Sequence, residues 1–180
     1  IIAGINSASL ANLLGLPSDD AVVRSMPNMP ALVGEGMTGL FSNSDQRAHG
    51  RILAERVMSA VGQCVWVSNE SDLDLVTAIS GSGPAYFFLF MESLSDAAVE
   101  LGMSPQTAHQ LSVQTARGAA KLAQASDDGL AKLRENVTSP GGTTEQAIES
   151  FEASELRAIV MSATRAAKKR SIELSEEFGL

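Results

Sequence analysis

The stretch "DQRAHGRILAERVMSAVGQCVWVS" (residues 45–68) marks the point at which the pattern of the sequence changes. Residues 45–62 place apolar side chains near helical spacing and end on a glycine, so they predict a helix. Residues 63–68 predict a strand, and upstream of them residues 21–27 and 36–42 predict two more. Strands that alternate with helices in this way indicate the second half of an α/β sheet.

After residue 68 the pattern is helical to the end of the sequence. Residues 84–102 carry a proline near their start and a glycine at their stop. Residues 104–125 open with Ser104 as N-cap and Pro105 at the first helical position. A short helix over 129–136, one starting at Thr144 and a long one over 154–178 follow. We therefore predict an incomplete α/β part over residues 1–68 and an all-α domain over 69–180.

Composition excludes several classes of protein. The 180 residues are 44% hydrophobic, so a core can form, and the net charge of -8 argues against nucleic acid or an anionic membrane as partner. A single cysteine excludes an internal disulfide framework and fits a reducing, cytoplasmic compartment. The longest uninterrupted apolar run, residues 85–91, is far shorter than the roughly 18 residues that span a membrane.

A glycine motif at residues 34–39, "GEGMTG", matches the dinucleotide fingerprint G-x-G-x-x-G letter for letter. That fingerprint needs a strand directly before it and a helix opening from it. Here "MPNMPALV" precedes the glycines and "LFSNS" follows them, and neither supplies that context. We expect these glycines to lie in a turn between extended segments.

The inventory of catalytic side chains is small. We expect His49 and His109 to be surface or packing residues and Cys64 to be a small buried apolar residue. No His, Cys, Asp or Glu cluster has the spacing of a metal site. An enzyme with this inventory would take its difficult chemistry from a cofactor.

The stretch "SPGGTT" (residues 139–144) has two interpretations. Thr143 with Gln146 three residues on matches a capping box, so a helix is expected to start near Thr144. The free N–H groups of that helix start, together with nearby hydroxyls, suit a carboxylate or phosphate. An ordinary helix-capping turn is the alternative. "SGSGPAYFF" (residues 80–88) likewise sets hydroxyls, glycines and a proline ahead of an apolar helix.

Four stretches together resemble the pyrroline-5-carboxylate reductase family. They are "VVRSMPNMPALVGEGMTGL", "TAISGSGPAYFF", "LSVQTARGAAKL" and "LRENVTSPGGTTEQAI", and the resemblance covers nearly the whole chain. It implies an oxidoreductase of proline biosynthesis that passes hydride from NADPH or NADH to the C=N carbon of 1-pyrroline-5-carboxylate, giving L-proline. It also implies the end of a Rossmann-type domain followed by a helical substrate-binding and dimerisation domain, and a homodimer or a larger homo-oligomer built on dimers.

The resemblance also implies roles for individual residues. Thr144 would act catalytically by relaying a proton to the ring nitrogen, although solvent remains an alternative donor. Glu70 would lie near that nitrogen and favour the iminium form. The substrate-binding residues would be Glu70, Asn136, Ser139, Gly142, Thr143 and Thr144. The cofactor-binding residues would be Ala3, Gly4, Met26, Pro27, Asn28 and Asn136.

The sequence departs from the family at its start. The family begins with a strand, a glycine-rich phosphate loop and a helix, and these are not found here; the opening "IIAGI" resembles the end of a later strand. We therefore expect a piece of a longer protein that binds cofactor poorly by itself. Two alternatives stay open: a related two-domain reductase acting on another small carboxylate, and an inactive fragment that serves only as a helical dimerisation and anion-binding module.

Overall fold

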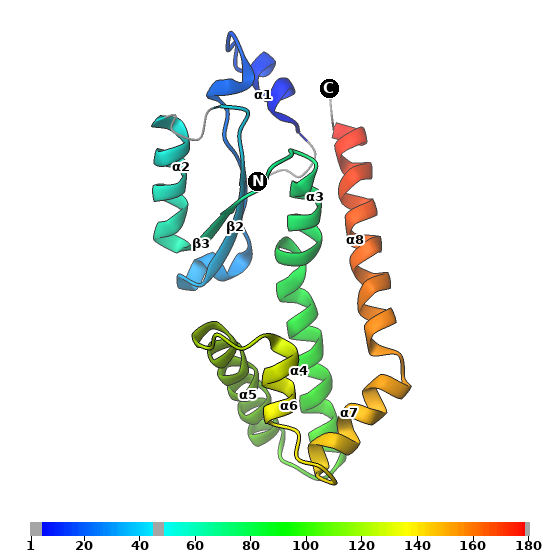
Figure 1. Cartoon of the computed structure of the whole chain (residues 1–180). Coiled ribbons are helices and arrows are strands. Elements are labelled where there is room, and N and C mark those ends of the chain that lie inside the picture. Colours follow the sequence, from blue (N-terminus) through cyan, green and yellow to red (C-terminus); the bar gives the residue numbers. More distant parts are fainter. Residues whose placement is uncertain (1–4, 45–48, 179–180) are drawn as a thin grey trace. The chain divides into compact units, whose positions relative to one another are not determined.

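The computed structural model describes residues 5–44 and 49–178 (Figure 1). Contacts divide the chain into two compact units. The first unit comprises Ile1–Ala85 and Ser162–Leu180, and the second comprises Tyr86–Met161. By its contacts, the segment from residue 69 to residue 85 thus belongs with the sheet of the first unit.

The first unit is built on a three-stranded sheet with the order β1-β2-β3. Strand β1 (Arg24–Met26) pairs antiparallel with β2 (Gly36–Phe41), and β2 pairs parallel with β3 (Gly62–Trp66). The register sets Ser25 opposite Leu40 and Thr38 opposite Cys64. The three strands predicted from the sequence are confirmed, although β1 is shorter than its predicted range.

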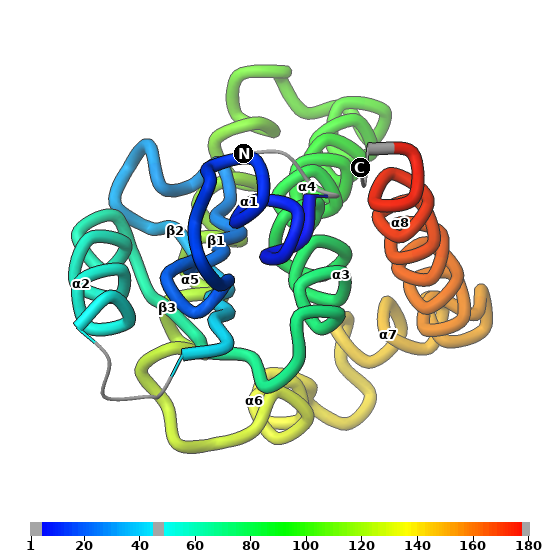
Figure 2. The backbone as a smooth tube through the Cα atoms, turned by 90° about the horizontal axis from the view of Figure 1, so that it is seen from above, coloured from blue at the N-terminus to red at the C-terminus, as the bar shows by residue number. Residues whose placement is uncertain are grey.

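Helices cover both faces of this sheet, with α2 on one side and α3 on the other (Figures 1 and 2). Arg51 of α2 stacks on the Trp66 ring of β3 at 3.8 Å, and the Trp66 Nε1–H donates to Glu55 at 3.1 Å. Helix α1 and the short 3-10 helices were not predicted. The elements are α1 (Ser7–Leu13), η1 (Asp19–Ala21), η2 (Met29–Val33), α2 (His49–Met58), η3 (Ser59–Val61), α3 (Asp72–Val76) and η4 (Thr77–Gly81). Residues 45–48 of the predicted helix lie outside the described residues.

The glycine motif of residues 34–39 is structural in this fold. Gly34 has a positive φ of 75° and ends η2, while Gly36 and Gly39 lie in strand β2. A Cβ on Gly36 would lie 2.8 Å from the carbonyl oxygen of Val61, and one on Gly39 would lie 2.7 Å from Val76 Cγ1. The expected turn is found at Gly34, where it follows a 3-10 helix. The expectation is wrong for Gly36 and Gly39, which lie inside β2 where close packing excludes a side chain.

The second unit is helical. Ser104 caps α5 by accepting from the Thr107 N–H at 3.2 Å, and Pro105 takes the first helical position, as predicted. The rings of Phe90 on α4 and Phe151 on α7 lie 6.1 Å apart. Two of the five helices, α4 and α8, extend into the first unit. The helices are α4 (Gly83–Glu100), α5 (Pro105–Ala125), α6 (Leu130–Asn136), α7 (Thr143–Ala153) and α8 (Leu156–Phe178).

The helical run Asp72–Glu100 is long and apolar enough to cross a membrane by length and composition alone. An 18-residue window within it has a mean hydropathy of 1.3, and 17% of that window is buried. The expectation that no segment reaches such a length is therefore wrong, because the mean hydropathy stays at 1.3 even though small and hydroxyl residues interrupt the apolar run. One such helix is weak evidence for a membrane, and its exposed side chains need another explanation.

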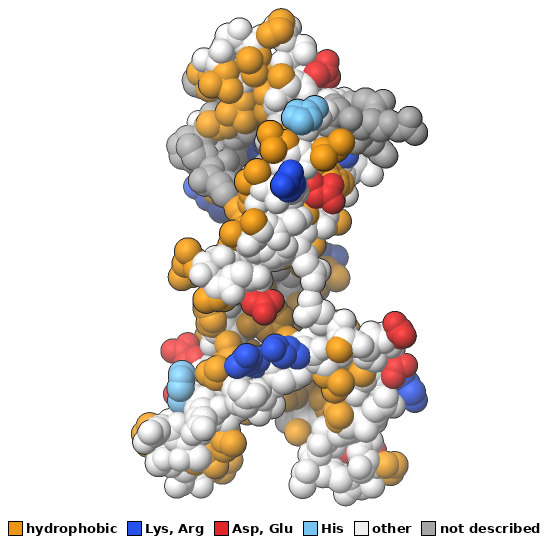
Figure 3. Space-filling model, turned by 90° about the vertical axis from the view of Figure 1, so that its left-hand side faces the viewer, with side chains coloured by type: hydrophobic (Ala, Val, Ile, Leu, Met, Phe, Trp, Pro, Cys, Tyr) orange, Lys and Arg blue, Asp and Glu red, His pale blue; other side chains and the backbone are white. Residues whose placement is uncertain are grey.

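Apolar side chains of the second unit are largely exposed. Among its residues, all of which the structure describes, Ala108 is the one hydrophobic side chain that is buried. On α4, Phe87 is 69% exposed and Leu89 is 63% exposed. Figure 3 shows hydrophobic side chains, in orange, at the surface of the chain. Burial of such side chains is the main stabilising term in folding, so this unit lacks most of a core of its own.

We expect Gly39→Ala to destabilise the protein by about 1–3 kcal/mol, because the new methyl group would collide with the branched Val76 side chain. Chemical denaturation at a fixed protein concentration measures the change. Gly50→Ala in α2 is the matched control, since its Cβ meets no described atom within 4 Å. Equal stability of the two variants would contradict tight packing of α3 on β2.

Candidate functional site

The segment Met26-Pro27-Asn28 lies beside the turn that carries Ser80 and Gly81. The Asn28 Nδ2–H donates to the Ser80 carbonyl oxygen at 3.1 Å, and Asn28 Oδ1 accepts from the Met37 N–H at 2.9 Å. A Cβ on Gly81 would lie 3.1 Å from Met26 Cε. The structure therefore brings together two of the stretches on which the resemblance rests.

The turn at Ser80 and Gly81 is a π turn inside a helical run. Residues Thr77–Gly81 form one π-helical turn, in which the Ser82 N–H donates to the Thr77 carbonyl at 2.8 Å. The predicted helix start near Pro84 is confirmed, since α4 begins at Gly83. Helix α3 and the π turn that precede it were not predicted. Single π turns inside α-helices are frequent at functional sites.

The Glu70 carboxylate is engaged within the first unit. Its Oε1 accepts from the Ser7 N–H at 2.6 Å, from the Ser7 hydroxyl at 2.7 Å and from Arg24 Nη1 at 2.9 Å. The Arg24 and Glu70 side chains are 17% and 28% exposed, so this ion pair is shielded from bulk water. If a ligand placed a positively charged ring nitrogen near Glu70, that nitrogen would compete with Arg24 for the same carboxylate.

The "SPGG" part of the second stretch, residues 139–142, forms a tight turn. The Gly142 N–H donates to the Ser139 carbonyl at 2.9 Å, and Gly141 has a φ of 70°. Proline at the second position and a left-handed glycine at the third define a type II turn. A Cβ on Gly142 would lie 2.9 Å from the Ser139 oxygen, so both glycines are required, for different reasons.

Helix α7 begins at Thr143, one residue before the predicted start, and Gly142 is its N-cap. The predicted capping box of Thr143 and Gln146 is wrong, since no side chain caps this helix start. Instead Glu145 reaches back and accepts from the Gly141 N–H at 2.7 Å, and Gln146 donates to Glu149. The turn leaves Glu145 in reach of Gly141, which sequence spacing alone did not indicate.

Several donors at the start of α7 have no partner among the described residues. These are the N–H groups of Thr143, Thr144 and Glu145 and the hydroxyls of Ser139, Thr143 and Thr144. Orphan N–H groups and the positive end of the helix dipole favour a negative ligand group. The loop can therefore bind a carboxylate.

Asn136 is the last residue of α6 and is exposed. Its Nδ2–H donates to Asp128 Oδ2 at 3.4 Å, a long hydrogen bond. Asn136, Ser139, Gly142, Thr143 and Thr144 all belong to the second unit. Of the remaining predicted site residues, Met26, Pro27, Asn28 and Glu70 belong to the first unit, while Ala3 and Gly4 lie outside the described residues.

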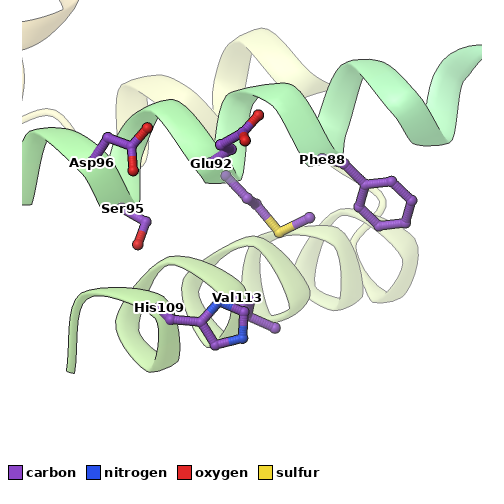
Figure 4. Close-up of a pocket in the computed structure, with 7 residues that line it drawn as sticks. Phe88, Glu92, Ser95, Asp96, His109 and Val113 are labelled. Atoms are coloured by element: carbon purple, nitrogen blue, oxygen red, sulfur yellow. The ribbon is translucent and has the colours of Figure 1, made fainter. Parts of the chain in front are cut away.

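The second unit also carries an open hollow of about 400 Å³ along α4 and α5. Figure 4 shows Phe88, Glu92, Ser95 and Asp96 on α4 and His109 and Val113 on α5. Apolar and acidic side chains line the same hollow. His109 is exposed, which decides for the surface position between the two expected for it, surface or packing.

Ion pairs elsewhere in the second unit do not involve the predicted site residues. Arg157 donates to Glu152 through Nε and Nη2, with distances of 2.7–3.0 Å. Through these hydrogen bonds the Arg157 guanidinium lowers the pKa of Glu152, and the Glu152 carboxylate raises the pKa of Arg157. Over the described residues, no group of three or more His, Cys, Asp or Glu side chains could hold a metal ion.

Comparison with known proteins decides the family. The family described as pyrroline-5-carboxylate reductase dimerisation matches residues 70–174. The chain belongs to the pyrroline-5-carboxylate reductase family. Two curated members, from Pseudomonas aeruginosa and Haemophilus influenzae, are 50% and 42% identical over 179 residues. These matches cover 99% of this chain and 65% of each relative, so the chain spans about two thirds of their length.

Solved structures of the pyrroline-5-carboxylate reductase family have the same fold. The pyrroline-5-carboxylate reductase from Coxiella burnetii is 44% identical with a TM-score of 0.90, covering 96% of this chain and 63% of that one. The Plasmodium falciparum pyrroline carboxylate reductase with NADP bound is 35% identical with a TM-score of 0.84, covering 96% and 68%. The predicted fold class, α/β followed by all-α, is confirmed.

Sequence reasoning missed the contacts of Ser7, Arg24 and Glu145. Arg24 was the one of the three with a signal, because it is a lone cation inside the apolar stretch "AVVRSMP". Such a residue usually has a buried or shielded partner. Ser7 and Glu145 gave no comparable signal, since their contacts depend on helix α1 and on the type II turn.

Proposed function

We propose that these residues form the substrate-binding and dimerisation part of a reductase that converts 1-pyrroline-5-carboxylate to L-proline with NADPH or NADH. The observation that carries the proposal is the "SPGGTT" loop, whose unpartnered N–H groups and hydroxyls suit a small carboxylate. Membership of the pyrroline-5-carboxylate reductase family supports that choice of substrate. The reaction is the last step of proline biosynthesis.

The chain's own residues would bind and orient the substrate. The substrate carboxylate would accept from the Thr143 and Thr144 N–H groups and from the hydroxyls around them. The Thr144 hydroxyl would relay a proton from solvent to the ring nitrogen, and hydride would then add to the neighbouring carbon of the protonated imine. Glu70, partly neutralised by Arg24, would favour the protonated imine only modestly. Hydride transfer to such an imine depends on proximity and orientation more than on a nucleophile.

The cofactor supplies the hydride when it is bound. Met26 ends strand β1, and Pro27 and Asn28 follow it; these three residues would contact the nicotinamide half of the cofactor. Asn136 would contribute to the same cofactor contact from α6. The glycines at 34–39 do not fit a pyrophosphate, because Gly36 and Gly39 are packed against Val61 and Val76. Cofactor affinity would therefore require a phosphate loop outside the described residues.

A homodimer would explain the exposed apolar residues of the second unit. Because this unit buries little besides Ala108, it needs another apolar surface to be stable. The matched dimerisation family covers residues 70–174, which includes α4 to α7 and most of α8. Helix α4 would bury its phenylalanine side chains against a second copy, which also accounts for its membrane-like composition. We propose a dimerisation domain over residues 69–180 and the end of the dinucleotide-binding domain over 1–68. By their contacts, residues 69–85 and 162–180 pack with the sheet of the first unit, so the proposed domains divide the chain differently from the two compact units.

The activity is tested by fusing the strand, glycine loop and helix of the Pseudomonas aeruginosa relative in frame ahead of Ile1. We expect the fusion to bind NADPH and to consume it with 1-pyrroline-5-carboxylate. The 180 residues alone should gain little thermal protection from NADPH. Strong binding by the unfused chain would contradict our view of residues 34–39. A folded, cofactor-binding fusion that reduces only other imino or hydroxy acids would identify a different reductase.

The carboxylate loop is tested by Thr144→Val in the same fusion. Loss of a charge-assisted hydrogen bond costs about 1.5–3 kcal/mol, so the Michaelis constant should rise roughly ten- to a hundredfold. Gly142→Val should raise the Michaelis constant further, because the new Cβ would collide with the Ser139 carbonyl oxygen. Thr115→Val, at an exposed site on α5, is the control. Unchanged kinetics in both loop variants would show that the loop is only a helix cap.

The dimer is tested by sedimentation of the 180-residue chain and of Phe87→Glu. We expect the parent to be a dimer or a multiple of it, and the variant to dissociate or unfold, because a charge would be buried in an apolar interface. Ser18→Glu adds the same charge at an exposed site of the first unit and should keep the dimer. A stable, folded parent monomer at micromolar concentration would rule the dimer out.

A further inference from the structure

Pro84 leaves one carbonyl of the helical run without its usual donor. In an α-helix the N–H of residue 84 would donate to the carbonyl of Ser80, four residues earlier, but proline has no N–H. The Asn28 Nδ2–H donates to that carbonyl instead, at 3.1 Å. We infer that Asn28 is a positioning residue, whose side chain replaces the hydrogen bond that Pro84 cannot make and so fixes the π turn against β2.

Both ends of the Asn28 amide are occupied in this arrangement. Oδ1 accepts from the Met37 N–H at 2.9 Å, and Nδ2 also lies 3.3 Å from the Ser80 hydroxyl oxygen. The Ser80 hydroxyl in turn lies 3.4 Å from the Met37 carbonyl oxygen. Asn28, Ser80 and Met37 therefore form a closed polar cluster that joins three separate segments. Replacing Asn28 would leave two backbone groups of this cluster unpaired at once.

The position of Asn28 in its own element supports this role. It is the N-cap of η2, where an asparagine side chain ordinarily accepts from the N–H two or three residues on. No such capping hydrogen bond is made here. The side chain instead makes hydrogen bonds with the Ser80 carbonyl and the Met37 N–H. Asn28 therefore makes long-range hydrogen bonds in place of a local capping one.

The cluster sets how closely the cofactor-side segment approaches the π turn. A Cβ on Gly81 would lie 3.1 Å from Met26 Cε, so the two segments are in close contact where Asn28 joins them. If the proposed function holds, Met26 and Pro27 help to place the nicotinamide ring. A displacement of about 1 Å in such a site can cost a hundredfold in rate. Asn28 would act on the reaction through its neighbours.

A double-mutant cycle in the 180-residue chain tests the link between Asn28 and Pro84. At a fixed protein concentration, Asn28→Ala should raise the unfolding equilibrium constant about tenfold. Pro84→Ala supplies a backbone N–H near the Ser80 carbonyl, so in that background the same change should cost less than about threefold. Asn43→Ala, which removes an exposed contact with Asp19, should show no such dependence on position 84. Equal effects of Asn28→Ala in both backgrounds would overturn the inference.

Amide hydrogen exchange separates positioning from general stability. Asn28→Ala should speed exchange at the Ser82 N–H, which closes the π turn, about tenfold. The Val67 N–H, bonded to the Leu40 carbonyl at the sheet, serves as reference and should change much less. Asn28→Asp keeps the acceptor for Met37 but loses the donor to Ser80, so it should resemble Asn28→Ala. Equal acceleration at Ser82 and Val67 would show a merely structural role and overturn the proposal.

Kinetics in the active fusion complete the test. Asn28→Ala should lower kcat at least tenfold with a smaller change in the Michaelis constant for the substrate, because orientation is lost while the carboxylate loop is intact. Unchanged kcat in a folded variant would overturn the positioning role for the reaction. If the parent fusion has no reductase activity, the proposed function is wrong, and the cycle and the exchange experiment still decide whether Asn28 holds the turn.

Discussion

Pro84 lies inside a helical run that extends from Asp72 to Glu100, and its missing N–H shapes the segments around it. The run accommodates the proline with one π turn, closed by the hydrogen bond from Ser82 to Thr77. Backbone groups that such a turn and a proline leave without a partner in the helix need partners elsewhere. The first unit does so from a distant segment, through Asn28. The proline, the π turn and the M-P-N stretch are therefore one structural unit, although more than 50 residues separate Asn28 from Ser80 and Pro84.

The elements predicted correctly are those with local signals. Ser104, Pro105 and the apolar spacing that follows specify α5 completely, because a cap and a first-turn proline act within a few residues. Strands β2 and β3 were predictable for a similar reason, since glycines and apolar runs bound them. Helix α1 was missed because it is short and carries serines and asparagines, which are poor helix formers. The π turn was missed because glycine, serine and proline in close succession are typical of loops.

The predicted site shows the same division between local and long-range information. The composition of "SPGGTT" indicates a glycine turn before a helix, and the structure contains one. It could not indicate which glycine takes the positive φ or which acid closes the turn. The hydrogen-bond partners of Glu70 could not be predicted from the sequence, since Ser7 and Arg24 lie 63 and 46 residues away in the chain. No local pattern encodes contacts at that separation.

The hydrogen bond from Gly141 to Glu145 bears on how the loop could hold a substrate. A carboxylate of the protein already accepts from one N–H of the turn, so a ligand carboxylate would use the donors that follow it, at Thr143 and Thr144. Two carboxylates near one helix start repel each other, but the Glu145 contact is exposed and its charge is screened by water. The hydroxyls of Ser139, Thr143 and Thr144 then gain importance, because neutral donors add hydrogen bonds to an anion without adding charge. A loop that is rich in hydroxyls, and whose own acid stabilises the turn, is therefore suited to bind a small carboxylate and release it again.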